Sequence, residues 1–430
     1  MLYSWLIRCA VPFAYAMLAW RGLSDRSYWQ GLGERLGFGR RLPTASLWLH
    51  AVSLGEMTAA APLLRALRTR HPGVPLVVTT ATPAGRARAR ALSDDAEIRY
   101  LPYDTPGSVR RFLARTQPRA AIIMETELWP NLLRECDRRG MPVLLASARL
   151  SAKSVARYRR FGKLFRTVFT ANLTIAAQTA ADAERFAAIG AVAVKVVGNV
   201  KFDVELDADV AAAGSALRVA YGVARGAARP VWIAGSTHAG EEEQVLDAHA
   251  SLRTQYPDAV LLLVPRHRDR FEGVADLLKS RGVVFARRSR MAGGGETAQP
   301  PAQLTADASV LLVDTVGELA VLYASADVAF VGGSLVPIGG HNLLEPAALG
   351  LPVLTGPSHS NSQEIAQLLL ARGAALEVSG AAELAAALGR LIADPQERRR
   401  MGQIGQEIVA ANRGSVDKLL AIIEASLRDH

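Results

Sequence analysis

The sequence predicts an α/β protein with two Rossmann-like domains, each built on a parallel sheet. Apolar runs of strand length alternate with amphipathic helical segments through most of the chain, the order expected when helices cover both faces of a parallel sheet. The pattern starts a second time after a helical, less apolar segment at residues 203–222. At 430 residues the chain is also longer than a single core usually grows.

These observations divide the chain into an N-terminal membrane anchor (1–22), a first domain (23–205) and a second domain (206–430). In the first domain the predicted strands are 47–52, 76–81, 121–125, 143–148, 173–178 and 194–199. In the second they are 231–236, 260–265, 309–314, 328–333 and 352–357. Ligands bind at the carboxyl ends of strands in such sheets. We therefore expect the two domains to face each other across a cleft, with polar residues just after the strands lining it.

Composition narrows the range of partners. Half of the residues are hydrophobic and 21% are charged, as in a folded globular protein. Fifty Lys and Arg against 40 acidic residues give a net charge of +10, which favours phosphorylated substrates or anionic lipid. The basic residues are dispersed and match no nucleic-acid-binding motif, so we expect no nucleic acid partner. Cys9 and Cys136 lack Cys or His neighbours at ligand spacing, which predicts no structural metal site and a reducing compartment.

The N-terminal segment LYSWLIRCAVPFAYAMLAW, residues 2–20, is apolar and about long enough to cross a bilayer. Trp5 and Trp20 suit the membrane–water interface, and the arginines that follow place the rest of the chain in the cytoplasm by the positive-inside rule. No convincing small-residue cleavage site follows, so we interpret the segment as an anchor. Arg8 and Pro12 interrupt it, and a helix lying in the interface or a buried helix of the first domain remain alternatives.

Residues 151–169, SAKSVARYRRFGKLFRTVF, alternate basic with aromatic and aliphatic residues on a predicted helix. Such a helix suits an anionic membrane surface. A solvated basic face over a buried apolar stripe fits the same pattern, and the sequence leaves both interpretations open.

The stretch FVGGSLVPIGGHNLLEPAALGLPVLTGP, residues 330–357, combines a strand, two glycine pairs and a short helix. The glycines let the backbone approach a ligand closely, and the helix start offers free N–H groups to a phosphate. Glu345 can accept hydrogen bonds from ribose hydroxyls, and His341 and Asn342 add polar groups that a plain connection does not need. We interpret the stretch as a sugar-nucleotide site, with a plain strand-to-helix connection as the alternative.

The motif HAVSLGE ends the first predicted strand and begins a helix. Ser53 and Gly55 make a tight turn there and are possible substrate contacts. Glu56 then lies at the start of the helix, where a carboxylate can act as a general base if its pKa and reach suit the proton it removes. The alternative is that Glu56 only caps the helix dipole.

In ETELWPN, Glu125 and Glu127 follow another strand. If the backbone there is extended, the two side chains point the same way, and a cation or a proton is needed to relieve the repulsion between their carboxylates. Two acids there could stabilise an oxocarbenium-like transition state, or they could simply be helix-start acids. Lys201, in GNVKFD, falls at the expected hinge between domains, where it could pair with a phosphate or carboxylate or remain solvated.

The first turn of the second domain, AGSTHAGEEE, offers Ser236, Thr237 and His238 as further possible substrate contacts. After the next strand, VPRH places Arg266 and His267 at the same edge, where an arginine can hold a phosphate by two hydrogen bonds. The turn DTVGEL resembles another strand-to-helix turn at that edge.

Taken in order, HAVSLGE, METELWPN, SARLS, GNVKFD, GSTHAGEE, VPRH, DTVGEL and GGHNLLEPAALGLPVLTGP resemble the motifs of the 3-deoxy-D-manno-octulosonic acid (Kdo) transferases of lipopolysaccharide synthesis. The resemblance extends over residues 46–357 and includes the N-terminal anchor. It implies a GT-B glycosyltransferase that moves Kdo from CMP-Kdo to the lipid A precursor, lipid IVA. It also implies an inverting reaction without a metal ion, at the cytoplasmic face of the inner membrane.

The resemblance also implies roles for individual residues. Glu56 would deprotonate the acceptor hydroxyl, and Glu127 and Lys201 would support the transition state. CMP would be held by Arg266, His267, Val316, Gly317, Glu318, Asn342, Leu343, Leu344 and Glu345.

Two positions depart from the family pattern: Ser147 stands where Asn is expected before ARLS, and Leu343 where Pro often follows GGHN. Two other functions remain as alternatives. One is a different GT-B sugar-nucleotide enzyme, such as a UDP-hexose transferase or an epimerase, and the other is a non-catalytic membrane-bound scaffold.

Overall fold

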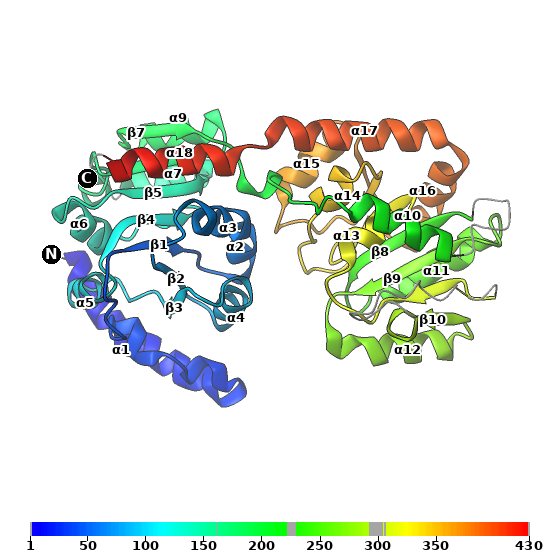
Figure 1. The fold of residues 1–430 in the computed structure, drawn as a ribbon, viewed down its shortest axis with the longest axis horizontal. Helices are drawn as coiled ribbons and strands as arrows, with labels where there is room; N and C mark the ends of the chain where they lie inside the picture. The colour runs from blue at the N-terminus through cyan, green and yellow to red at the C-terminus, as the bar shows by residue number, and fades with distance from the viewer. Residues whose placement is uncertain (1, 161, 222–228, 292–303, 305–306, 429–430) are drawn as a thin grey trace. The chain divides into compact units, whose positions relative to one another are not determined.

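The computed structural model describes residues 2–428 except residue 161 and residues 222–228, 292–303 and 305–306. The chain forms two compact units, Met1–Asp203 with Asn412–His430, and Val204–Ala411. Within the described residues each unit contains a seven-stranded parallel sheet with helices packed on it (Figure 1). The α/β class and the two Rossmann-like domains predicted from the sequence are confirmed.

The first sheet has the strand order β3-β2-β1-β4-β5-β6-β7. Strand β1, in the interior of the sheet, is buried at every position, because helices cover both faces of a parallel sheet. The register places Leu49 of β1 between Val78 of β2 and Ile122 of β4. The strands are β1 (Ser46–His50), β2 (Leu76–Thr80), β3 (Glu97–Tyr100), β4 (Pro118–Met124), β5 (Val143–Ala148), β6 (Leu173–Ala177) and β7 (Ala193–Val196).

The first unit begins with the long helix α1 (Leu2–Ser24). Short 3-10 turns follow it: η1 (Arg26–Trp29), η2 (Leu32–Leu36) and, near the end of the unit, η3 (Val200–Phe202). The remaining helices are α2 (Leu54–Ala59), α3 (Ala61–Arg70), α4 (Pro83–Leu92), α5 (Pro106–Thr116), α6 (Pro130–Arg138), α7 (Ala152–Arg160), α8 (Gly162–Phe165), α9 (Ala180–Ala188) and the C-terminal α18 (Ser415–Arg428).

Helix α5 shows how local sequence sets these elements. The Thr105 hydroxyl accepts a hydrogen bond from the N–H of Ser108, and Pro106 occupies the first helical position, where its missing N–H costs nothing. The helix ends at Gln117, whose φ of 49° is left-handed. Its buried face includes Phe112, which meets Trp48 of β1 edge-on with ring centroids 4.9 Å apart.

The second sheet has the order β10-β11-β9-β8-β12-β13-β14. Its strands are β8 (Val231–Thr237), β9 (Val260–Pro265), β10 (Phe285–Arg287), β11 (Val310–Leu312), β12 (Val328–Val331), β13 (Val353–Thr355) and β14 (Ala375–Glu377). Its helices are α10 (Val210–Ala220), α11 (Glu242–Arg253), η5 (Arg268–Arg270), α12 (Phe271–Ser280), η6 (Arg288–Arg290), α13 (Leu319–Ala324), α14 (Leu344–Ala348), α15 (Gln363–Ala371), α16 (Ala381–Ala393) and α17 (Pro395–Asn412).

The C-terminus differs from the sequence-based domain boundaries. We expected residues 206–430 to form one domain, but α18 returns to the first unit (Figure 1). Leu419, Leu420 and Ile423 are each at most 2% exposed and join the core on one face of the first sheet. This face needs an apolar cover, and the amphipathic α18 supplies it beside α3.

All eleven predicted strands are present, with ends that differ by up to three residues. Three strands were missed: β3, β10 and β14. Each has three or four residues and includes a charged side chain, and β10 and β14 form the edges of their sheet. Short, charged edge strands lack the apolar signature of central ones.

Candidate functional site

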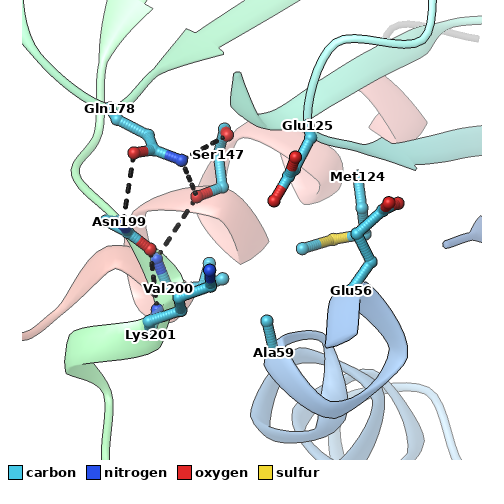
Figure 2. Close-up of a pocket in the computed structure, with 9 residues that line it drawn as sticks. All are labelled: Glu56, Ala59, Met124, Glu125, Ser147, Gln178, Asn199, Val200 and Lys201. Carbon is cyan, nitrogen blue, oxygen red and sulfur yellow. Dashed lines mark hydrogen bonds between the residues drawn. The ribbon is translucent and has the colours of Figure 1, made fainter. Parts of the chain in front are cut away.

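Both sheets contain a point at which the strand order reverses, and ligands of such folds bind there, beyond the carboxyl ends of the strands. In the first sheet the reversal lies between β1 and β4, which pair in parallel. Glu56 follows β1 and Glu125 follows β4. Both line one pocket together with Lys201, so the structure brings together three side chains that are far apart in sequence (Figure 2). The other residues lining it are Ala59, Met124, Ser147, Gln178, Asn199 and Val200.

Glu56 is held at the first turn of α2. Ser53 caps this helix, its hydroxyl accepting from the N–H of Glu56 at 3.3 Å, while the Glu56 carboxylate accepts from the N–H of Val52 at 2.8 Å. Burial raises the pKa of Glu56 to about 7, and the negative charges of Glu125 and Glu127 add to the rise. A carboxylate with a pKa near neutrality, at a pocket wall, has the properties that a general base requires.

Glu125 and Ser147 both adopt left-handed backbone conformations, with φ of 56° and 55°. Glu125 follows β4, and Ser147 is the last residue but one of the neighbouring strand β5. Such strain in residues other than glycine tends to occur at functional sites. Our expectation that Glu125 and Glu127 point the same way held only for an extended backbone, and the left-handed φ of Glu125 does not meet this condition. Burial raises the pKa of Glu127, with Glu125 adding to the effect, yet Glu127 does not line the pocket.

The wall opposite Glu56 is a hydrogen-bonded network (Figure 2). Gln178 donates to the Ser147 carbonyl at 2.9 Å, and Asn199 donates to the Gln178 side-chain oxygen at 3.1 Å. Asn199 in turn accepts from the N–H of Lys201 at 3.0 Å, which fixes the backbone of Lys201 at the pocket. Sequence reasoning did not select Gln178 or Asn199, although each is polar and is the last residue of a predicted strand.

In the second sheet the reversal lies between β8 and β12. His238 follows β8 and His341 lies in the loop after β12, and their Nε2 atoms are 2.7 Å apart. The ring of His267, which follows β9, meets His238 edge-on at 5.3 Å. The structure therefore brings together the polar residues predicted on three separate strand ends.

One buried residue that organises this edge was missed. Glu241 is fully buried, and its carboxylate accepts from the N–H of His238 at 3.0 Å. It also accepts from the N–H groups of Gly333, Ser334 and Leu335, at 2.6, 2.9 and 2.8 Å. One carboxylate thus ties the loop after β8 to the loop after β12. The sequence shows Glu241 only as the first of three consecutive acids, which gives no signal of its burial.

The glycine-rich stretch differs from our expectation in one respect. Helix α14 has only five residues, so it offers a much weaker dipole to a phosphate than a longer helix would. One N–H group at the start of this helix, that of Leu344, already donates to the Asn342 side-chain oxygen at 3.0 Å. The Asn342 side-chain nitrogen donates to the Glu345 carboxylate at 3.1 Å. Burial raises the pKa of Glu345, and the nearby charge of Arg266 opposes the rise. Arg266, Asn342 and Glu345 therefore form one cluster.

The other predicted contacts of the second unit vary in exposure. Val316 is 62% exposed in the turn after β11, and Glu318 of the same turn accepts from Arg288 at 2.7 Å. Thr237 is buried, and its hydroxyl group donates a hydrogen bond to the Glu242 carboxylate within the protein. Leu343 and Leu344 are also buried, which limits them to backbone contacts with a ligand. The remaining predicted contacts are Ser236, which has a left-handed φ of 60°, and Gly317, with φ of 98°.

In the first unit, α1 is the helix among the described residues that is long and apolar enough to cross a membrane. It also contacts the protein: Tyr3 donates to Asp104 at 2.8 Å, and Tyr15 donates to the Leu32 carbonyl at 2.7 Å. Its apolar side chains with the greatest exposure include Phe13, 78% exposed, and Leu23, 75% exposed. The helix thus combines a protein-facing side with an exposed apolar side.

The basic segment predicted as one helix over residues 151–169 forms the two short helices α7 and α8, with residue 161 outside the described residues. Arg157, Arg159 and Arg160 are exposed. Tyr158 packs edge-on against Phe165 and against the core. A basic face over a partly buried apolar stripe is therefore present, which resembles the second of our two interpretations.

No group of three or more His, Cys, Asp or Glu side chains within the described residues is placed to hold a metal ion.

Comparison with known proteins places this geometry in a family. Residues 30–204 match the family described as 3-Deoxy-D-manno-octulosonic-acid transferase (kdotransferase), and residues 292–408 match glycosyl transferases group 1. Among solved structures, a glycosyltransferase from Rickettsia africae aligns over 90% of this chain and 100% of its own, with a TM-score of 0.55 at 10% identity. The UDP-GlcNAc 2-epimerase of Neisseria meningitidis, solved with UDP-GlcNAc, aligns over 90% and 100%, with a TM-score of 0.51 at 15% identity.

At these identities the two structures show only that this chain has the same fold. Together with the match to glycosyl transferases group 1, this fold defines a glycosyltransferase of the GT-B class. A 3-deoxy-D-manno-octulosonic acid transferase of Haemophilus influenzae is 38% identical over 99% of this chain and 98% of its own. That of Bordetella pertussis is 38% identical over 98% of each. The chain belongs to the 3-deoxy-D-manno-octulosonic acid transferase family and is a glycosyltransferase that transfers Kdo in lipopolysaccharide synthesis.

Proposed function

We propose that this chain transfers Kdo from CMP-Kdo to the lipid A precursor, lipid IVA, in a single inverting displacement. The observation that carries the proposal is Glu56, a carboxylate at the switch point of the first sheet with its pKa raised to about 7. An alcohol is a weak nucleophile unless a base removes its proton as it attacks. Glu56 takes the proton of the acceptor hydroxyl, and the oxygen then attacks the anomeric carbon of Kdo.

Burial of Glu56 and three other charged groups support this step. The pKa of Glu56 is raised mainly by burial, which keeps its affinity for a proton high enough to accept one near pH 7. The charge of Glu125, which lines the pocket, stabilises the positive charge that develops on the sugar ring, and Glu127, outside the pocket lining, adds to this from further away. Lys201, at the same pocket as Glu56, offsets the charge of the acids during transfer.

The second unit binds the donor. Arg266, beside Asn342 and Glu345, holds the phosphate of CMP, and Glu345 accepts hydrogen bonds from the ribose hydroxyls. His267 and the turn of Val316–Glu318 provide the remaining CMP contacts at the same sheet edge. No metal ion takes part in the proposed reaction, since a fixed arginine and backbone N–H groups can carry the charge of the departing phosphate.

The protein works at the cytoplasmic face of the inner membrane, where its lipid acceptor is located. The exposed apolar side of α1 enters the bilayer, and the arginines after it remain on the cytoplasmic side. Arg157, Arg159 and Arg160 of α7 add attraction to anionic lipid headgroups.

The direct test is release of CMP from CMP-Kdo with lipid IVA as acceptor, comparing the wild type with Glu56→Gln. The variant keeps an acceptor for the Val52 N–H but cannot take a proton, so its rate falls by about 10² to 10⁴ while CMP still raises the thermal unfolding temperature. Glu184→Gln, an exposed acid on α9, is the matched control and retains full activity. Turnover by Glu56→Gln at the wild-type rate would remove Glu56 from this role, and stabilisation by UDP in place of CMP would point to a different nucleotide.

A further inference from the structure

The switch point of the second sheet contains a pair of histidines that must share a hydrogen atom. The Nε2 atoms of His238 and His341 are 2.7 Å apart, and the two rings are nearly parallel, with an interplanar angle of 9°. At this distance one nitrogen donates and the other accepts. Two cationic rings would direct two N–H groups at each other, so the pair can hold one positive charge but not two.

Arg266 and His267 lie near both rings, and Arg270 lies near His238. Arg266 and His267 come from the end of β9 and Arg270 from η5, while Glu241 is the acidic group that faces His238. Burial lowers the pKa of His341 to about 4, and Arg266 and the other two histidines lower it further. Burial also lowers the pKa of His238, with Glu241 opposing. In the free protein the pair is therefore neutral near pH 7.

Glu241 cannot offset a charge on the pair by moving, because its carboxylate already accepts four backbone N–H groups. Arg270 is likewise engaged, by an ion pair with Glu242 at 2.9 Å. An anionic ligand that binds beside the pair would change this electrostatic balance.

The backbone leaves room for this pair at the place where a ligand is expected. Gly333 follows β12 with φ of 69°, and a Cβ there would lie 2.9 Å from Cδ2 of His341 and 3.5 Å from that of His238. Both imidazoles are partly exposed, so a ligand at the sheet edge can reach them. Strand ends on either side of a switch point are the usual ligand position in this fold.

We propose that His238 and His341 form a proton-sharing pair that binds an oxyanion of the donor sugar nucleotide and takes up one proton from solvent as it does so. The inference rests on the proposed function, in which the second unit binds the donor. An anion beside Arg266 and the pair neutralises the positive surroundings, which favours the charged form of an imidazole. Donor binding is then stronger at lower pH. The oxyanion is the phosphate of the nucleotide or the carboxylate of the sugar.

The test is calorimetric titration with CMP, which carries only the phosphate, and with free Kdo, which carries only the carboxylate. Measurements at several pH values between 5.5 and 8, in buffers of different ionisation enthalpy, give the number of protons taken up. The wild type is compared with His238→Gln and His341→Gln, which keep a hydrogen-bonding amide but cannot be protonated. His71→Gln, in the first unit, is the control. The titration of CMP itself is common to all proteins and cancels in the comparison.

The wild type and His71→Gln are expected to take up more protons than the two variants, by up to one per ligand. The ratio of variant to wild-type Kd rises as pH falls, by up to about tenfold per pH unit. A difference with Kdo but not with CMP supports the proposal and assigns the carboxylate, and the reverse result assigns the phosphate. Equal proton uptake by all four proteins, with CMP still bound, overturns the proton-sharing pair and leaves the proposed function standing. Failure of the wild type to bind either ligand overturns both.

Discussion

The carboxylate of Glu56 accepts a hydrogen bond from the backbone N–H of Val52, four residues earlier, at 2.8 Å. Together with the bond from the Glu56 N–H to the Ser53 hydroxyl, this closes the first turn of α2 reciprocally. The sequence left two interpretations of Glu56 open, a helix cap and a general base. The geometry shows that one carboxylate can serve both, because the cap fixes its position while burial and neighbouring acids raise its pKa.

The pH dependence of transfer follows from this arrangement. A base acts in its ionised form, so kcat/KM for the acceptor, measured at saturating CMP-Kdo, should rise with pH and level off above the Glu56 pKa of about 7. Glu125 adds a like charge that raises this pKa. In Glu125→Gln that charge is gone, and the ascending limb of the profile should move to lower pH.

The measurement is kcat/KM between pH 5 and 9 for the wild type, Glu125→Gln and the exposed control Glu184→Gln. The shape of the profile decides the outcome, whatever the variant does to the maximal rate. An ascending limb that stays in place in Glu125→Gln would show that another group controls the base.

The sequence predicted the sheets and the position of Glu56 after β1 because inner strands are apolar runs and site residues follow them. Lys201 was expected at a hinge between domains; it follows the edge strand β7 and lines the pocket of Glu56. It did not predict the left-handed backbone at Glu125 or Ser147, since these conformations are set by contacts between neighbouring strand ends. Nor did it predict that α18 completes the core of the first unit, since an amphipathic helix does not identify the sheet it covers. The contacts that were missed connect residues far apart in sequence.

Glu241 illustrates the same limit and supplies a second prediction. Four backbone N–H groups from two loops depend on its carboxylate, and hydrogen bonds to a charged acceptor are worth about 1.5–3 kcal/mol each. Glu241→Ala should lower the free energy of unfolding by at least about 3 kcal/mol and weaken CMP binding. The free energy of unfolding of Glu241→Gln should lie between those of the wild type and Glu241→Ala, because the Gln oxygen can still accept hydrogen bonds while its amide nitrogen faces N–H donors.

Urea unfolding and CMP titration of both variants check this prediction. Glu407→Ala, an exposed acid on α17, is the control and should change stability by no more than about 0.5 kcal/mol. Equal stability of Glu241→Ala and Glu407→Ala would contradict a central role for the buried carboxylate.

The return of α18 to the first unit depends on Asp203. Its carboxylate accepts from the N–H of Gly414 at 2.6 Å and from that of Val416 at 2.7 Å, at the start of the helix. Asp203→Ala should therefore lower the free energy of unfolding by about 0.5–2 kcal/mol, the usual cost of losing a helix cap. Asp203→Asn, which keeps one oxygen, should lose less.

Chemical denaturation monitored by tryptophan fluorescence measures the difference, since Trp48 lies in the core of the first unit. The exposed Asp94→Ala is the control, with an expected change within about 0.5 kcal/mol. A loss in Asp203→Ala no larger than that of the control would mean that packing alone holds α18.

The exposed apolar side of α1 leads to a prediction about membrane binding. Phe13 is 78% exposed and Trp20 is 71% exposed, whereas full burial of a large apolar side chain is worth about 1.5–3 kcal/mol. Phe13→Ser and Trp20→Ser should each reduce partitioning onto vesicles of phosphatidylethanolamine and phosphatidylglycerol by about tenfold. Val196→Ser removes a side chain that is 54% exposed on β7 and should leave partitioning unchanged. Co-sedimentation at low and high salt separates the apolar contribution from that of the arginines, because only the latter is screened. If the α1 variants sediment as the Val196→Ser control does, the helix does not contribute its apolar side to the bilayer.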